Sequence, residues 1–186
     1  MVSQPLAKDA KQDATRQGRA SGGARPAYDL IELLFFAYRD FVSDPDRILA
    51  DYSFGRAHHR VLHFVARRPG LTIAELLDIL RITKQSLNRV LKELVDQEFI
   101  EQRAGVEDRR QRLLYPTQKG RELALALATV QTTRIMRALA EGGAATRNEA
   151  RRFLESMIDP TDRADVMRLI HDGVTVVTTK GDSTEL

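Results

Sequence analysis

The residues best suited to specific binding are polar side chains of a helix predicted to begin at Lys84. They are Lys84, Gln85, Ser86, Asn88, Arg89 and Lys92. No acidic residue occurs from 81 to 92. Amide and guanidinium groups make paired hydrogen bonds to adenine and guanine edges, and a helix without acids can enter a phosphate-lined groove. This pattern predicts base reading in the major groove of double-stranded DNA.

A second group of residues occupies a loop between two short predicted strands, at residues 99–103 and 112–115. Its candidate DNA-binding residues are Asp108, Arg109, Arg110 and Arg112. An arginine-tipped hairpin fits the DNA backbone and the minor groove beside a recognition helix. The same residues could instead form a surface ion-pair cluster, in which each pair is worth roughly 0–1 kcal/mol. The Asp-x-Arg spacing at the tip of a hairpin favours groove binding.

Local signals predict the elements that bring these two groups together. A first helix is expected at residues 53–67 and is ended by Pro69-Gly70. Thr72 and Glu75 have the spacing of a capping box, which starts a second helix. Thr83 can then cap the helix that carries the polar face. The predicted order is therefore helix, helix, tight turn, helix and hairpin.

The terminal regions are too apolar to be covered by this small unit alone. Residues 28–42 are apolar over more than one helical face, so both sides need burial and a partner subunit is a natural cover. Asp44-Pro45-Asp46 is expected to end that helix. A long helix is predicted at residues 118–140, and the last helix at 161–171.

These signals divide the chain into five parts. They are a flexible basic arm at residues 1–27, an N-terminal dimerisation helix and connector at 28–52, the DNA-binding unit at 53–116, C-terminal dimerisation helices at 117–172 and a flexible tail at 173–186.

Composition excludes several kinds of chemistry. The chain has 186 residues, a formal net charge of +3 and no cysteine, which rules out disulfides, thiolate–metal sites and a cysteine nucleophile. No glycine-rich phosphate loop, Ser/His/Asp pattern or metal triad occurs, so no enzyme activity and no cofactor is expected. The richest apolar run, residues 30–38, is shorter than the about 20 residues that span a bilayer. We expect a cytoplasmic protein without a membrane segment.

Three histidines lie close together on the helix at 53–67, namely His58, His59 and His63. The i,i+4 spacing of His59 and His63 can chelate a metal if further ligands converge. No cysteine or carboxylate motif accompanies them, so ordinary helix histidines near a subunit interface are the favoured interpretation. Metal or haem binding is the minority hypothesis, and no metal site is predicted.

The chain resembles the MarR family of bacterial winged-helix regulators over residues 28–140, most closely over 71–120. The family's wing signature is an Asp, one residue, an Arg, apolar strand residues and a Leu-Thr-x-x-Gly junction. Here it reads Asp108-Arg109-Arg110-Gln111-Arg112-Leu113-Leu114-Tyr115-Pro116-Thr117-Gln118-Lys119-Gly120. Pro116 stands where the family usually has Leu, and it is expected to shorten the second wing strand.

The resemblance implies a mainly α fold with a small β-wing: a winged helix-turn-helix with N- and C-terminal dimerisation helices. It implies a homodimer whose terminal helices interlock and whose subunits each present one winged helix to double-stranded DNA. In the family, the Arg matching Arg110 enters the minor groove and the Asp matching Asp108 helps to hold the wing. Members repress or activate genes and respond to small anionic or phenolic ligands, so a small-molecule effector is a possible partner.

Two functions therefore compete. The first is a dimeric, sequence-specific transcriptional regulator that reads a pseudo-palindromic site. The second is a winged-helix protein-interaction module without specific DNA binding, for which the polar face of the helix at Lys84 would be an ordinary solvated surface. The grouping of Gln85, Asn88 and Arg89 favours the first.

Overall fold

The structure, a computed structural model, describes residues 25–105, 108–143 and 146–178. Nearly all of the predicted basic arm, and the last eight residues of the predicted tail, lie outside the described residues. The described part contains seven helices and one three-stranded antiparallel sheet, so the prediction of a mainly α fold with a small β-wing is confirmed.

In chain order the elements are α1 (Tyr28–Ala50), α2 (Arg56–Arg67), β1 (Leu71–Thr72), α3 (Ile73–Leu80), α4 (Lys84–Asp96), β2 (Ile100–Ala104), β3 (Arg112–Pro116), α5 (Gln118–Gly142), α6 (Thr146–Met157) and α7 (Pro160–Thr178).

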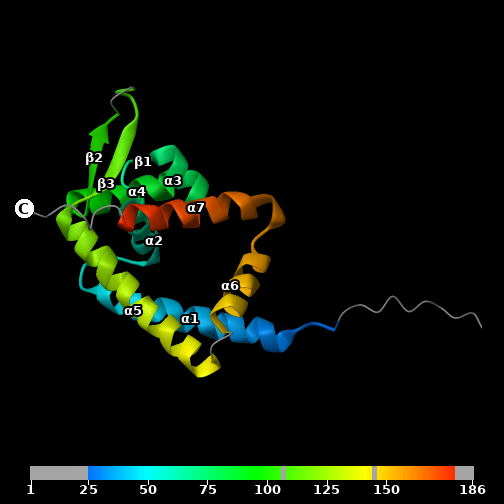
Figure 1. Cartoon of the computed structure of the whole chain (residues 1–186). Coiled ribbons are helices and arrows are strands. Elements are labelled where there is room, and N and C mark those ends of the chain that lie inside the picture. Colours follow the sequence, from blue (N-terminus) through cyan, green and yellow to red (C-terminus); the bar gives the residue numbers. More distant parts are fainter. Residues whose placement is uncertain (1–24, 106–107, 144–145, 179–186) are drawn as a thin grey trace, which may run out of the picture.

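The predicted winged helix-turn-helix is formed by α2, α3, α4 and the sheet. The strand order is β1-β3-β2, and Leu114 at the centre of β3 pairs with Leu71 of β1 on one side and Gln102 of β2 on the other. Leu114, Leu87 and Leu94 are fully buried in one apolar core beneath the helices. Figure 1 shows the β2–β3 hairpin projecting from this core, beside the helix pair α3–α4. The core thus fixes the hairpin relative to α4.

The N-terminal helix, which was expected to end at Asp44-Pro45-Asp46, does not end there, so that expectation is wrong. α1 continues through Pro45 to Ala50. A proline inside a helix costs roughly 3 kcal/mol, because it removes one backbone hydrogen bond and crowds the preceding turn. Here Val42, Pro45 and Leu49 are all buried, and the C-terminal half of α1 packs on α5 and α2. Burying one large apolar side chain contributes about 1.5–3 kcal/mol to stability. The burial of these side chains therefore offsets the cost of the proline.

Three other boundaries differ from the predictions. The helix predicted from residue 53 begins only at Arg56, because Ser53 has a positive φ of 57° and Gly55 is extended. Pro116 does not shorten the wing, since it is the last residue of β3 and pairs with Ile100. The backbone of α7 continues to Thr178, so the predicted flexible tail does not begin at residue 173.

The strand β1 is not among the predicted elements. It has two residues and overlaps the cap of α3, so its sequence carries no alternation from which a strand could be recognised.

The long helices α1 and α5 cross on the side of the molecule opposite the wing (Figure 1). Large apolar side chains on the N-terminal part of α1 are exposed in this single chain: Tyr28, Leu30, Ile31, Leu33, Leu34, Phe35, Phe36 and Tyr38. On α6, Phe153, Leu154 and Met157 are also exposed. Among the described residues, no helix is both long and apolar enough to cross a membrane.

Candidate nucleic-acid interface

The helix α4 presents a polar surface that is held in place by its capped N-terminus. Thr83 adopts an extended conformation, and its Oγ1 accepts a hydrogen bond from the Ser86 backbone N–H at 3.2 Å. The Thr83 hydroxyl in turn donates to the Ser86 side chain at 2.9 Å. All six candidate residues of this helix, Lys84, Gln85, Ser86, Asn88, Arg89 and Lys92, are exposed, as the sequence pattern predicts.

The opposite face of α4 explains this exposure. Leu87, Val90, Leu91 and Leu94 are buried in the core. Because these residues recur every three or four positions, they define one side of the helix, and the polar residues between them face solvent. The core therefore fixes the rotation of α4 about its axis.

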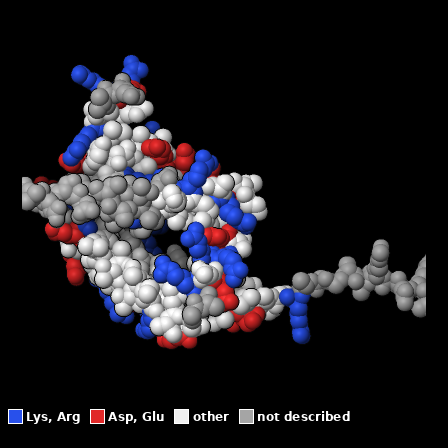
Figure 2. Space-filling view, in the orientation of Figure 1, with Lys and Arg blue, Asp and Glu red and all other residues white. Residues whose placement is uncertain are grey.

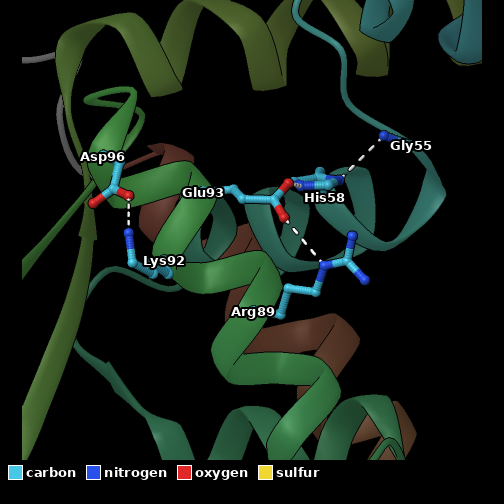
Figure 3. Close-up of polar contacts among 6 residues, drawn as sticks. All are labelled: Gly55, His58, Arg89, Lys92, Glu93 and Asp96. Atoms are coloured by element: carbon cyan, nitrogen blue, oxygen red, sulfur yellow. Dashed lines mark hydrogen bonds and ion pairs between the residues drawn. The ribbon is translucent and has the colours of Figure 1, made fainter.

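A chain of polar contacts connects α4 to α2 (Figure 3). The Gly55 backbone N–H donates to Nδ1 of His58 at 3.1 Å, and Nε2 of His58 lies 2.8 Å from Oε2 of Glu93. Because Nδ1 accepts a hydrogen bond, the neutral ring carries its proton on Nε2 and donates it to Glu93. Nε of Arg89 lies 3.4 Å from Oε1 of the same carboxylate. The contact with His58, followed by the contact with Arg89, lowers the pKa of Glu93.

The roles of His58 and Glu93 in this chain of contacts do not follow from the helical pattern of the sequence. The ring of His58 also stacks on Phe54, with centroids 4.5 Å apart, and its side chain is 11% exposed. Its position three residues after Gly55 is where a side chain can reach back to the N-cap of a helix. The i,i+4 spacing of Arg89 and Glu93 is the other signal that could have been used.

A second polar contact on α4 involves Lys92. Its Nζ contacts the carboxylate of Asp96 one turn later, as Figure 3 also shows, and this hydrogen bond raises the pKa of Lys92. Both side chains are largely exposed, so the ammonium group stays accessible to solvent.

The wing carries three of the four predicted residues near its tip. Oδ1 of Asp108 accepts a hydrogen bond from the Arg110 backbone N–H at 2.8 Å, and the Asp108 carbonyl accepts from the Gln111 N–H at 3.0 Å. These bonds shape the loop that presents Arg109 and Arg110, which are both exposed. Figure 2 shows Lys and Arg side chains at the tip of the hairpin, away from the body of the molecule. Residues 106 and 107 lie outside the described part.

Close contacts also hold the two strands of the wing and close its loop. Arg112 pairs with Ala104 where β3 begins, and the guanidinium of Arg103 lies 4.4 Å from the ring centroid of Tyr115. Gly105 closes the hairpin by donating to the Gln111 carbonyl at 3.1 Å. A Cβ at Gly105 would lie 2.6 Å from the Asp108 carbonyl oxygen, so only glycine fits this closure.

The Thr-x-x-Gly junction anchors the wing to α5. Oγ1 of Thr117 accepts from the Gly120 N–H at 3.0 Å and donates to the Glu98 carbonyl at 2.6 Å, which confirms Thr117 as the helix cap. A Cβ at Gly120 would lie 2.0 Å from the Phe99 carbonyl oxygen. The glycine thus permits α5 to start against the backbone that leads into β2.

His59 and His63 lie on α2 with their ring centroids 6.4 Å apart. Burial lowers the pKa of both imidazoles, and the charge of Arg67 lowers that of His63 further. Among the described residues, no three His, Asp or Glu side chains gather in a way that could hold a metal ion. His58 points instead to Glu93, so the three histidines do not share a site.

Residues 52–111 match the sequence model of the MarR family. The HTH-type transcriptional regulator PetP of Rhodobacter capsulatus is 47% identical over 133 residues, which cover 72% of this chain and 80% of that protein. The chain belongs to the MarR family. It is a transcriptional regulator of this family, and neither the family nor this relative is enzymatic.

Solved structures share the fold. The crystal structure of MarR is 25% identical, with a TM-score of 0.53 over 72% of this chain and 98% of that one. The structure of Streptococcus pneumoniae FabT in complex with DNA is 16% identical, with a TM-score of 0.60 over 71% of this chain and 99% of that one.

Proposed function

We propose that the protein is a cytoplasmic, sequence-specific DNA-binding regulator that acts as a homodimer on a pseudo-palindromic site. The observation that carries the proposal is the exposed face of α4, where Gln85, Asn88 and Arg89 lie on a helix whose rotation is fixed by its buried side. Amide and guanidinium groups at these positions would read base edges, while Lys84 and Lys92 would contact phosphates.

The wing supplies the second half of the interface. Arg109 and Arg110 lie at the tip of a hairpin that projects beside α4 (Figures 1 and 2). A narrow, A/T-rich minor groove has an enhanced negative potential that attracts arginine. We propose that Arg110 enters the minor groove next to the site read by α4, and that Asp108 holds the loop in the required shape.

The apolar face of α1 supports the homodimer. Phe35 is 68% exposed and Leu33 63% exposed in the single chain, although isolated proteins seldom expose large contiguous apolar patches. A second copy would cover these side chains and set two α4 helices about one helical turn of DNA apart, roughly 34–36 Å. A small-molecule effector would act by favouring one of two spacings of the paired wings.

A gel-shift experiment on the DNA upstream of the protein's own coding region tests the DNA-binding proposal. Arg89→Ala should weaken cognate binding and relax base preference, since one bidentate base contact is worth roughly 1–3 kcal/mol. Arg110→Ala should lower affinity most on sites with A/T-rich flanks. Arg152→Ala, which removes an exposed charge on α6, serves as the control. It should change neither the affinity for cognate DNA nor the base preference.

Each outcome of the gel shift has a defined meaning. Equal loss on every sequence would make Arg89 a phosphate contact rather than a base contact. Weak binding without sequence preference at physiological salt would instead favour the protein-interaction module.

Light scattering tests the homodimer separately. Phe35→Glu places a charge in the exposed apolar face of α1, and we expect a shift from dimer to monomer with the winged helix still folded by circular dichroism. An unchanged dimer would assign the subunit interface to another surface, and a monomeric wild type would overturn the homodimer.

A further inference from the structure

The turn between α3 and α4 contains a residue in an unfavourable backbone conformation. Arg81 ends α3 with a φ of 50° and a ψ of 48°, in the left-handed region, and α4 begins three residues later at Lys84. Residues with a large side chain seldom adopt this conformation, and they keep it where the surrounding structure holds them. Because Arg81 sets the direction in which the chain leaves α3, a contact that holds Arg81 also helps to fix the start of α4.

The helix α7 supplies such a contact. Nη2 of Arg81 lies 2.7 Å from Oδ1 of Asp162, in the first turn of α7. The side chain of Asp162 is only 32% exposed, whereas that of Arg81 is 71% exposed. Asp78, one turn before Arg81 on α3, is closer in sequence, but within the described residues it makes no ion pair. The ion pair therefore joins the helix-turn-helix to the C-terminal part of the chain.

The other carboxylates of α7 and its N-terminus have different partners. Oδ1 of Asp159 accepts hydrogen bonds from the backbone N–H of Thr161 at 3.0 Å and from its hydroxyl at 2.7 Å. Asp165 contacts Arg168, which lies on α7 itself. Asp162 is thus the acid whose ion pair connects α7 to the turn before α4.

Apolar packing between α3 and α7, which lie side by side in Figure 1, is incomplete. A pocket of about 710 Å³ separates them and is lined by the apolar side chains of Leu77, Ile79, Val166 and Leu169. A second polar contact crosses to α7 from the end of α2, where Nη2 of Arg68 donates to the Leu169 carbonyl at 2.8 Å. Since the apolar side chains leave this space, the two polar contacts contribute much of the connection between α7 and the winged helix.

We propose that Asp162 is a positioning residue for DNA recognition: by holding the guanidinium of Arg81, it keeps the turn before α4 in the conformation from which α4 reads DNA. This inference rests on the proposed function and adds to it a residue outside the polar face of α4. Hydrogen bonds to base edges depend on the angle of approach, whereas attraction to phosphates depends mainly on charge. A small rotation of the turn should therefore reduce base discrimination more than it reduces binding to arbitrary DNA.

A merely electrostatic role of Asp162 predicts the opposite result. If its carboxylate only neutralised Arg81, its removal would free a positive charge close to the DNA-binding helix. Affinity would then rise for every DNA sequence alike. The sign of the change in affinity therefore distinguishes the two roles.

Asp162→Asn tests the proposal in the full-length protein. Fluorescence anisotropy at constant salt gives the affinity for the fragment that the wild type selects from genomic DNA and for a scrambled fragment. We expect weaker binding of the selected fragment and a roughly fivefold or larger fall in the ratio of the two affinities, the equivalent of one hydrogen bond. The matched control Asp165→Asn removes the same charge from the same helix and should keep the wild-type ratio. Tighter binding of both fragments by Asp162→Asn, or equal ratios in the two variants, would overturn the proposal.

Reversing the ion pair tests whether Asp162 acts through Arg81. Aspartate tolerates the left-handed conformation better than most residues, so Arg81→Asp keeps the turn accessible. We expect Arg81→Asp alone to lose discrimination and the double variant Arg81→Asp/Asp162→Arg to return the ratio to within about twofold of the wild type, because a coupled pair gives non-additive effects. The ratio is the readout, since a negative charge near DNA weakens binding to both fragments. Additive losses in the double variant would contradict the coupling.

Hydrogen exchange without DNA separates this inference from the proposed function. Amides of residues 82–88 should exchange faster in Asp162→Asn than in Asp165→Asn, while those of β3 in the core should not differ. Equal exchange at residues 82–88 would overturn the positioning role even if DNA is bound selectively. Faster exchange there, in a protein whose wild type does not select DNA, would remove the proposed function and leave the contact with the turn in place.

Discussion

The carboxylate of Glu93 accepts a hydrogen bond from His58 at 2.8 Å and lies 3.4 Å from the guanidinium of Arg89. His58 is held in turn by the backbone of Gly55, so the N-terminus of α2 is connected to a candidate base-reading residue on α4. Arg89 is 85% exposed and would otherwise sample many rotamers. Glu93 therefore restricts the directions from which Arg89 can approach DNA.

Glu93→Gln tests this restriction. Glutamine can still accept from His58, but it lacks the charge that attracts Arg89. We expect several-fold lower discrimination between cognate and scrambled DNA, together with tighter binding to scrambled DNA, because a negative charge beside the phosphates is removed. The control Glu122→Gln removes the same charge from an exposed site on α5, where Gln118 donates to Glu122. Equal discrimination by wild type and Glu93→Gln would show that Glu93 does not steer Arg89.

The partly buried histidines His59 and His63 make stability depend on pH near neutrality. Burial lowers the pKa of His63 below its ordinary value of 6.5 and does the same for His59. The unfolded chain therefore binds more protons in the window between the lowered value and 6.5, and the free energy of unfolding falls as pH falls through that window. We expect His59→Gln/His63→Gln to show a smaller slope in urea denaturation between about pH 8 and about pH 5.5. An unchanged slope would assign the pH dependence to other groups.

Gly120→Ala should destabilise the fold because its Cβ would lie 2.0 Å from the Phe99 carbonyl oxygen. Backbone must move to relieve this contact, so we expect a loss of about 3 kcal/mol in the free energy of unfolding, at the upper end for overpacking. Gly55→Ala is the matched control, because a Cβ there meets nothing within 4 Å. It also keeps the N–H that caps α2 and should cost less than about 1 kcal/mol. Equal stability of the two variants in urea would contradict the steric argument.

Asp108→Ala should loosen the wing without unfolding the core. It removes the acceptor for the Arg110 N–H, a hydrogen bond of 2.8 Å. We expect an unchanged melting temperature and a roughly three- to tenfold loss of DNA affinity, the equivalent of one hydrogen bond. Asp108→Asn keeps an oxygen at the same place and should restore most of the affinity. If both variants lose affinity equally, the charge of Asp108 matters and its hydrogen bond does not.

Much of the winged unit could be predicted because its signals are local. Thr72, Thr83 and Thr117 each cap a helix with a hydrogen bond spanning three residues, which depends only on sequence spacing. The apolar positions of α4 likewise fix its buried face through the helical repeat.

The exposure of the candidate residues on α4 was predictable from sequence spacing, but their contacts with other elements were not. The polar face of α4 follows from spacing within one helix. The contact of His58 with Glu93 joins positions 35 residues apart, and only the packing of α2 on α4 brings them together.

By itself, the sequence determined where the three threonine-capped helices α3, α4 and α5 start, which face of α4 is apolar and where the cationic hairpin lies, because these depend on interactions within a few residues. Only the tertiary structure decided that α1 passes through Pro45, that Leu71–Thr72 joins the sheet as β1, and that Arg81 meets Asp162 of α7. In each case burial or pairing with a distant segment outweighs the local preference of the chain.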